Sequence, residues 1–80
     1  MADPVMSHLA GVDQAQEAAA EAFVLRTLRA AGGAPMRPDD LFEAGRHQAN
    51  LSYSVLRLVL WTLVGKGLVE LTKDWRVKLA

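Results

Sequence analysis

The sequence predicts a single domain that is mainly α with a small β-hairpin (α+β): three helices followed by a C-terminal hairpin. Three stretches carry this prediction. A run of strong helix formers ends at Gly32-Gly33, a second apolar helical stretch runs from Ser52 to Gly65, and the residues after Gly67 alternate apolar and polar side chains. A chain of 80 residues can bury one core and has no room for a second domain.

Composition narrows the class of protein. The absence of cysteine excludes disulfides, thiolate metal sites and a thiol nucleophile, but it does not indicate the compartment. A reducing cytoplasm is the default expectation. No apolar run is long enough to span a membrane, and the N-terminal "MADPVMSHLAGVDQ" lacks the basic cluster of a secretory signal. The content of alanine and arginine suggests a bacterial source.

The charges cancel over the whole chain but not within its halves. Residues 1–45 contain three basic and seven acidic side chains, a net charge of −4, whereas residues 46–80 contain six basic and two acidic ones, a net charge of +4. The neutral total argues against a strongly basic nucleic-acid-binding protein. The C-terminal half nevertheless generates a local basic field.

The first helix is predicted from about residue 14 to Gly32-Gly33. Asp13 and Gln16 form a capping pair, the segment that follows is rich in alanine and glutamate, and the glycine pair is a C-terminal stop signal. Residues 1–12 are then an N-terminal arm, and residues 13–80 form the folded domain. The apolar stripe of this helix comprises Phe23, Val24, Leu25 and Leu28.

A short second helix is predicted over residues 38–44. Pro38 suits a first helical position, and the three carboxylates that follow it favour a helix N-terminus. The three residues 34–36, "APM", are predicted to form a short extended piece, because proline disfavours helical geometry in the residue before it. We expect the helix to be anchored by Leu41 and Phe42 and to stop near Gly45.

The polar residues "RHQAN" are predicted to connect to a third helix, which Asn50 or Ser52 caps and which ends near Val64 or Gly65. On a helical wheel, one continuous face points inward. This inner face comprises Leu60 at its centre with Tyr53, Leu56, Leu63, Val64 and Gly67. The outward wedge comprises Ser54, Val55, Leu58, Trp61, Thr62 and Gly65, with Arg57 at its margin.

Two registers fit the hairpin after Gly67. A two-residue turn at Lys73-Asp74 places Thr72 opposite Trp75 and mixes polar with apolar side chains on one face. A three-residue loop over residues 72–74 instead pairs Leu71 with Trp75, Val69 with Val77 and Glu70 with Arg76. We favour this register because it gives one apolar face and a cross-strand ion pair on the other. It points Trp75 into the core, and Asp74 is expected to tolerate a left-handed conformation.

The order of these elements, together with one short motif, resembles the winged helix-turn-helix superfamily. The motif is "L-x-x-L-x-x-x-G-L-V", formed by Leu60, Leu63, Gly67, Leu68 and Val69 where the third helix enters the hairpin, and the resemblance covers residues 14–80. It implies a small bacterial transcriptional regulator that binds double-stranded DNA as a homodimer, with the third helix in the major groove and the hairpin, or wing, on phosphates. By position, the resemblance implies that Ser52, Ser54 and Arg57 face the groove and that Lys73 and Arg76 lie on the wing. The charged residues themselves suggest a DNA-binding rim that contacts phosphates, and the alternative is a solvated charged face. The residues of this rim are Arg46, His47, Arg57, Lys73, Arg76 and Lys78.

The outward wedge of the third helix departs from the usual pattern of that superfamily. Base readout usually needs Arg, Lys, Asn or Gln on this face, yet its centre carries Leu58 and Trp61. Either the N-terminal arm folds back over them, or they contact a partner. The alternative function is therefore a protein-interaction module, whose partner-binding residues are Val55, Leu58 and Trp61.

The chain offers little for catalysis or for a cofactor. His8 and His47 are far apart in the sequence and lack a paired metal-ligand pattern. The carboxylates of Asp39, Asp40 and Glu43 are more often partners of a helix dipole than acid–base groups. Ser52 and Ser54 have no evident base, and no glycine-rich loop follows a strand to hold phosphate. We therefore expect neither an enzyme nor a bound metal or cofactor.

Overall fold

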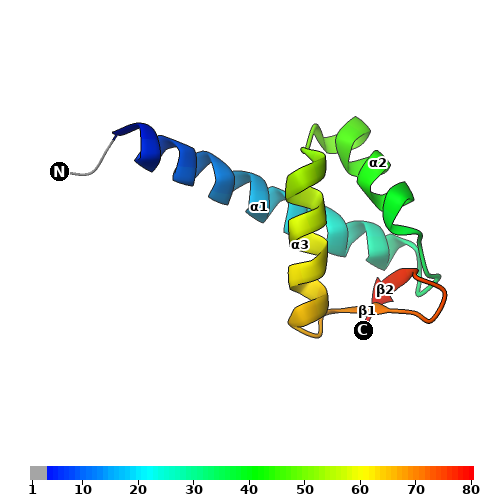
Figure 1. Cartoon of the computed structure of the whole chain (residues 1–80). Coiled ribbons are helices and arrows are strands. Elements are labelled where there is room, and N and C mark those ends of the chain that lie inside the picture. The colour runs from blue at the N-terminus through cyan, green and yellow to red at the C-terminus, as the bar shows by residue number, and fades with distance from the viewer. Residues whose placement is uncertain (1–3) are drawn as a thin grey trace.

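The computed structural model describes the backbone of residues 4–80 and the side chains of residues 15–80, and it confirms the predicted fold class. Three helices are followed by a two-stranded antiparallel hairpin, in the predicted α+β winged-helix layout (Figure 1). The helices are α1 (Pro4–Ala30), α2 (Pro38–Ala49) and α3 (Tyr53–Gly65), and the strands are β1 (Val69–Leu71) and β2 (Val77–Leu79). None of the helices described is long and apolar enough to cross a membrane.

Helix α1 begins earlier than the sequence predicts. It starts at Pro4, so Asp13 lies inside the helix and is not its N-cap, and most of the predicted arm is helical backbone. Proline is compatible with a first helical turn, and the good helix formers that follow outweigh the cost of Gly11, about 1 kcal/mol relative to alanine. The N-terminal half of α1 runs away from the other elements (Figure 1). The backbone of this segment therefore does not fold back over α3, and the side chains of the arm lie outside the described residues.

The end of α1 agrees with the prediction. The helix stops at Ala30, and Gly32 and Gly33 both take positive φ angles, 65° and 92°. Glycine adopts this conformation without the steric penalty of a Cβ atom. The chain then reaches Met36, which forms the predicted short extended piece: its N–H donates to the Val77 carbonyl, and its own carbonyl accepts from the Val77 N–H, both at 2.8 Å.

Helix α2 is longer than predicted, because Gly45 lies within it and does not end it. A Cβ atom at Gly45 would lie 2.7 Å from Cδ1 of Leu56, so the glycine lets α2 and α3 approach closely. The predicted connection "RHQAN" forms the last turn of α2 and its cap. Asn50 takes the left-handed conformation, with φ at 51°, and its N–H donates to the Gly45 carbonyl. Asparagine tolerates this conformation better than most residues.

Helix α3 has the predicted bounds, and Ser52 is its cap. The Ser52 hydroxyl oxygen accepts a hydrogen bond from the Val55 N–H at 3.2 Å. The buried face of α3 is rotated from the predicted one. Val59 is buried because α1 lies along that side of α3. Of the residues predicted to point inward, Tyr53 is 45% exposed and Gly67 lies beyond the end of the helix. The buried residues of α3 are Leu56, Val59, Leu60 and Leu63.

The hairpin register differs from both predicted ones. Val69 pairs with Leu79, and Leu71 pairs with Val77. The connecting loop has three residues as expected, but it lies one residue later in the chain, at residues 73–75. Thr72 sets this position: its N–H donates to the Arg76 carbonyl at 2.7 Å, and its hydroxyl oxygen accepts from the Arg76 N–H at 3.0 Å.

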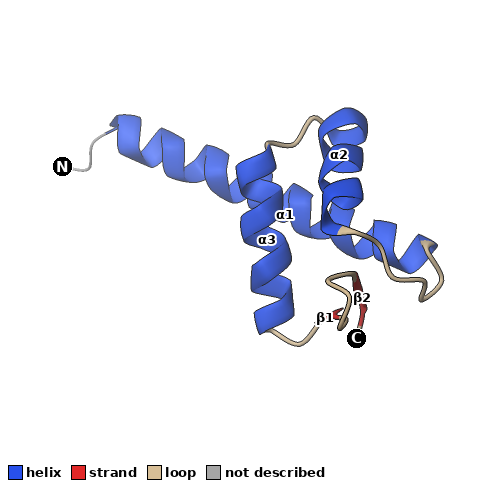
Figure 2. Cartoon of the chain, turned by 45° about the vertical axis from the view of Figure 1, so that its right-hand side comes forward, coloured by secondary structure: helices blue, strands red, loops and turns tan. Residues whose placement is uncertain are grey.

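One core of buried side chains holds together the elements whose arrangement Figure 2 shows. Each helix, the turn before α3 and both strands contribute to it. The slide of the hairpin preserves its two faces, because Val69 and Val77 still point to the same side and are both buried. The buried residues of the core are Ala20, Phe23, Val24, Leu28, Leu41, Phe42, Leu51, Leu56, Val59, Leu60, Leu63, Val69 and Val77.

Candidate nucleic-acid interface

The side of α3 that faces away from α1 is exposed and largely apolar. Leu58 is 55% exposed and Trp61 is 40% exposed, so nothing in the described part of the chain buries them. Val55, by contrast, is half-buried and packs against the core. A surface depression runs along this side of the helix. Its lining residues, which we call the outer α3 face, are Tyr53, Ser54, Arg57, Leu58 and Trp61.

Trp61 stands at the centre of the exposed side of α3. On the helical repeat, Ser54 lies two turns before it and Gly65 lies one turn after it, nearly in line. Both of these neighbours are small and exposed. The indole ring therefore projects from the helix between two small residues, where a partner surface can reach it.

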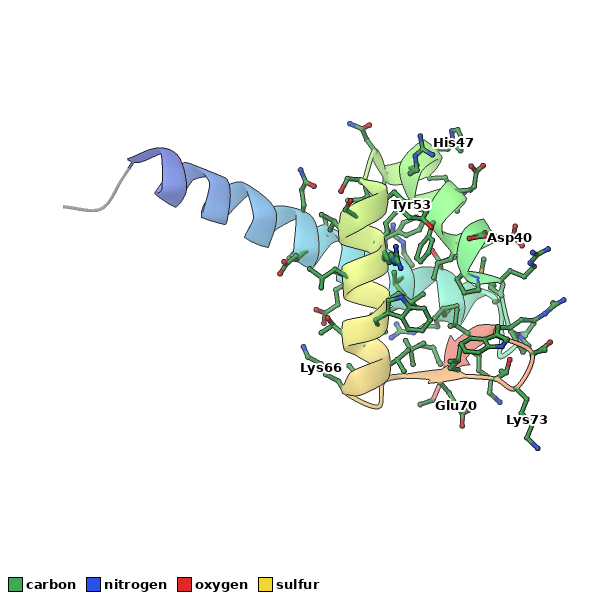
Figure 3. The ribbon with its side chains drawn as sticks, in the orientation of Figure 1. Asp40, His47, Tyr53, Lys66, Glu70 and Lys73 are labelled. Carbon is green, nitrogen blue, oxygen red and sulfur yellow. The ribbon has the colours of Figure 1, made fainter. Side chains whose placement is uncertain are left out.

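Exposed cations surround the outer α3 face. Arg46 and His47 lie on the last turn of α2, and Lys66 follows the last residue of α3. Figure 3 shows His47 at one end of the face, Lys66 at the opposite end and Lys73 at the tip of the wing. Arg57 belongs to the face itself. Nε2 of His47 lies 3.6 Å from Oε2 of Glu43. Arg46 lines a depression with Asp39 and Glu43, and Lys66 lines one with Glu17 and Glu21.

Carboxylates are missing from a long stretch of the chain that builds this surface. Residues 44–69 contain neither aspartate nor glutamate, and the nearest acids, Glu43 and Glu70, lie just outside the stretch. We call residues 44–69 the acid-free segment. It covers the second half of α2, the turn and the whole of α3. The outer α3 face carries no negative side chain of its own, but acids of two other elements border it. Glu17 and Glu21 of α1 line a depression with Leu58, and Asp39 and Glu43 of α2 line one with Tyr53.

The wing carries cations that are paired with acids. Nε of Arg76 lies 3.1 Å from Oδ2 of Asp74, and Nζ of Lys78 lies 3.5 Å from Oε2 of Glu70. The predicted pair of Glu70 with Arg76 is wrong, because the register places Lys78 opposite Glu70. These ion pairs are solvent-exposed, so each contributes little to stability.

Trp75 is at the tip of the wing and not in the core, which corrects a second prediction. It is 71% exposed, and it takes the left-handed conformation expected for Asp74, with φ at 63°. The cause is the turn around it. The Thr72 hydroxyl also donates to the Asp74 carboxylate, and the Trp75 N–H donates to the Thr72 carbonyl at 3.1 Å. A three-residue hairpin loop closes with its last residue left-handed, and that residue here is Trp75.

The same turn predicts how Asp74 titrates. The hydrogen bond from Thr72 is the main cause that holds the pKa of Asp74 below its ordinary value of 3.8, with a smaller contribution from Arg76. The carboxylate therefore favours the folded wing above the ordinary pKa, and this contribution is lost as the pH falls through the lowered pKa. We expect an NMR titration to place the Asp74 midpoint below 3.8. Thr72→Val should raise the midpoint and Thr72→Ser should not; an unchanged midpoint in Thr72→Val would contradict the assignment.

Two features of the site were not expected from the sequence. Tyr53 was assigned to the inner face, yet its ring packs edge-on against Phe42, with centroids 5.1 Å apart, and leaves part of the side chain exposed. Tyr53 is the first residue of α3, where the helix has not yet reached α1. That position was the signal in the sequence that could have predicted its exposure. Lys66 was not assigned a role, although it belongs to the basic half of the chain.

The remaining predicted site residues lie where their sequence positions imply. Ser52 and Ser54 flank the start of α3 and are exposed, with Ser52 also serving as the cap. The carboxylates of α2 lie in its first turns, the expected place for partners of the helix dipole. Within the described residues, no group of three histidine, aspartate or glutamate side chains is placed to hold a metal ion.

Comparison with known proteins returned no match: no protein-family model, no curated protein and no solved structure matches this chain.

Proposed function

We propose that this chain is a small DNA-binding protein of the winged helix-turn-helix superfamily, acting as a transcriptional regulator. The acid-free segment carries the proposal. DNA phosphates repel carboxylates, and a surface that approaches them closely is expected to lack acids and to present cations. Residues 44–69 contain no acid and present Arg46, Arg57 and Lys66, all exposed. The acids that border this surface belong to α1 and to the first half of α2.

The proposed complex places the outer α3 face in the major groove of a DNA duplex. Ser54 and Arg57 are then the polar groups that reach base edges. Ser52 is available to phosphate as well: its oxygen accepts from the Val55 N–H, and its own O–H can donate outward. The phosphate contacts at the two sides of the groove come from Arg46, His47, Lys73, Arg76 and Lys78.

The proposal includes a homodimer, since two-fold symmetric DNA sites are read by pairs of such domains. Helix α1 is the proposed contact, because its N-terminal half extends beyond the rest of the chain (Figure 1). Sedimentation at increasing protein concentration tests this part separately. A single monomeric species in the presence and absence of DNA would contradict it.

A second candidate function, a protein-interaction module, is supported by one observation. Leu58 and Trp61 are large, apolar and exposed on the same side of α3. Contiguous apolar surface of this kind often marks a protein contact. In this alternative the cations around the face are a solvated rim that does not bind DNA.

Titration of a mixed-sequence DNA duplex at low and moderate salt decides between the two candidates. We expect binding whose logarithm falls linearly with the logarithm of the salt concentration, with a slope of about −0.9 for each phosphate contact. A protein without phosphate contacts has no such slope. Absence of binding at low salt would contradict the DNA proposal and favour the interaction module, for which Trp61→Ala is then the first variant to make.

A further inference from the structure

We propose that a depression between the tip of the wing and the start of α2 binds a small zwitterion with an apolar side chain, the chemistry of a free amino acid. This inference goes beyond the proposed DNA-binding function and does not depend on it. The depression has a volume of about 470 Å³, a size typical of small-molecule sites. Its lining residues, which we call the wing-tip site, are Arg37, Pro38, Asp39, Asp74, Trp75 and Arg76.

Backbone hydrogen bonds fix the two walls of the wing-tip site relative to each other. Met36 and Val77 form an antiparallel bridge in which each N–H donates to the other residue's carbonyl at 2.8 Å. Arg37 follows one residue of this bridge and Arg76 precedes the other, so these two arginines are neighbours across the bridge. Side chains alternate between the two faces of such a pair. Because Val77 is buried in the core, both arginines point outward, where they line the depression.

Two like charges across the bridge favour an anionic group between them. Like charges in neighbouring positions of an antiparallel pair are destabilising. Asp74 compensates one of them, since its Oδ2 lies 3.1 Å from Nε of Arg76. Within the described side chains, Arg37 has no ion-pair partner. A ligand carboxylate at this position accepts hydrogen bonds from Arg37 and from the remaining N–H groups of Arg76.

The acids of the same depression determine the second charge of the ligand. Asp39 lines the wing-tip site and, within the described side chains, forms no ion pair. A ligand with negative charge alone is repelled by Asp39 and Asp74, whereas an ammonium group beside the carboxylate is attracted by both. An amino acid carries these two groups on a single carbon atom. A zwitterion is therefore the ligand that suits both signs of charge in the site.

Trp75 provides the apolar wall. Its side chain is 71% exposed, and its backbone is left-handed, with φ at 63°. This conformation is strained for a bulky residue, and the exposed indole gains little burial in return. Strain of this kind is found at binding sites, where the side chain serves the ligand and not the core. The indole ring and the ring of Pro38 present apolar surface to the side chain of an amino acid.

NMR spectra of the full chain test the proposal, because the indole N–H groups of Trp61 and Trp75 give separate signals that Trp75→Gly assigns. The standard L-amino acids are added one at a time. We expect those with large apolar side chains to shift the Trp75 signal in a saturable manner and to leave the Trp61 signal in place. Absence of a Trp75 shift with every amino acid would overturn the proposal.

Derivatives of the tightest-binding amino acid test the two charges separately. Its N-acetyl derivative lacks the ammonium group, and its amide lacks the carboxylate. We expect each to bind at least roughly tenfold more weakly, the usual effect of losing a hydrogen bond between charged groups. Binding of both derivatives as tightly as the amino acid would overturn the assignment of a zwitterion.

Three variants connect these effects to the wing-tip site. Arg37→Gln should weaken binding of the amino acid and leave binding of the amide unchanged, whereas Asp39→Asn should do the same with respect to the N-acetyl derivative. Arg46→Gln, on the last turn of α2, is the matched control and should bind as the unmodified chain does. Equal binding by Arg37→Gln and Arg46→Gln would overturn the proposal.

Trp75→Gly separates loss of the site from loss of the fold. Glycine adopts the left-handed conformation without strain, so this variant should resist urea at least as well as the unmodified chain. It should lose the preference for large apolar side chains, and retention of that preference would contradict the role of the indole. The DNA titration is carried out without amino acids, so failure of either proposal is recognised independently of the other.

Discussion

Replacing Leu56 by alanine is expected to lower the free energy of unfolding by about 2–5 kcal/mol, the usual range for removing a leucine from a packed core. Leu56 is fully buried, and its side chain fills the space between α3 and Gly45 of α2. The loss leaves a cavity at the closest approach of the two helices. Urea denaturation followed by circular dichroism measures the change.

Gly45 provides the matched test of that contact. Gly45→Ala alone should destabilise the protein, since overpacking costs about 1–3 kcal/mol and the helix-propensity gain of about 1 kcal/mol does not cover it. The same substitution in the Leu56→Ala background should stabilise, because the new methyl group enters the cavity. A double-mutant cycle reads this reversal of sign directly. An effect of the same sign in both backgrounds would show that Gly45 is not limited by Leu56.

Local signals were sufficient where one short segment determines an element. The sequence narrowed the cap of α3 to Asn50 or Ser52, because a cap depends on hydrogen bonds within one helical turn, and its end to Val64 or Gly65. The structure assigns the cap to Ser52 and the end to Gly65. The stop after Ala30 followed from Gly32-Gly33 for the same reason. The parity of the hairpin was also predictable, since alternation fixes which residues share a face even when the register slides.

The wrong predictions concern residues that are compatible with two different structural roles. Gly45 reads as a helix stop, yet it is required inside α2 by the approach of Leu56, which lies in another element. Trp75 reads as core, but the hydrogen bonds of Thr72 position the loop so that it falls at the exposed tip. Neither interaction is visible in apolar periodicity. Register in a short hairpin depended here on one hydroxyl group more than on the apolar pattern.

The residues on the outward side of α3 could be predicted from the sequence, but whether they are exposed could not. The sequence placed Leu58 and Trp61 on the outward wedge, but it left open whether the N-terminal segment covers them. Whether these two side chains are covered depended on the path of the backbone in the N-terminal half of α1. Because α1 continues to Pro4 as one helix, its backbone leaves the outer α3 face open.

On the proposed DNA-binding function, Arg57→Glu is expected to weaken the binding of a duplex at low salt at least tenfold. A hydrogen bond to a charged group contributes roughly 1.5–3 kcal/mol, which corresponds to about ten- to a hundredfold in affinity, and the new carboxylate adds repulsion from phosphate. Arg57 is exposed, so the substitution should leave the free energy of unfolding nearly unchanged. Fluorescence anisotropy of a labelled duplex measures the binding.

The control must separate a local contact from the overall loss of positive charge. Arg29→Glu makes the same change of charge on the last turn of α1, outside the acid-free segment, and Arg29 is likewise exposed. If α3 enters the groove, Arg57→Glu weakens binding much more than Arg29→Glu does. Arg57→Ala should in addition reduce the salt slope by about one phosphate contact if Arg57 binds phosphate, and leave it unchanged if it binds a base. Equal losses in the two glutamate variants would mean that only the net charge matters and that α3 is not the element that reads DNA.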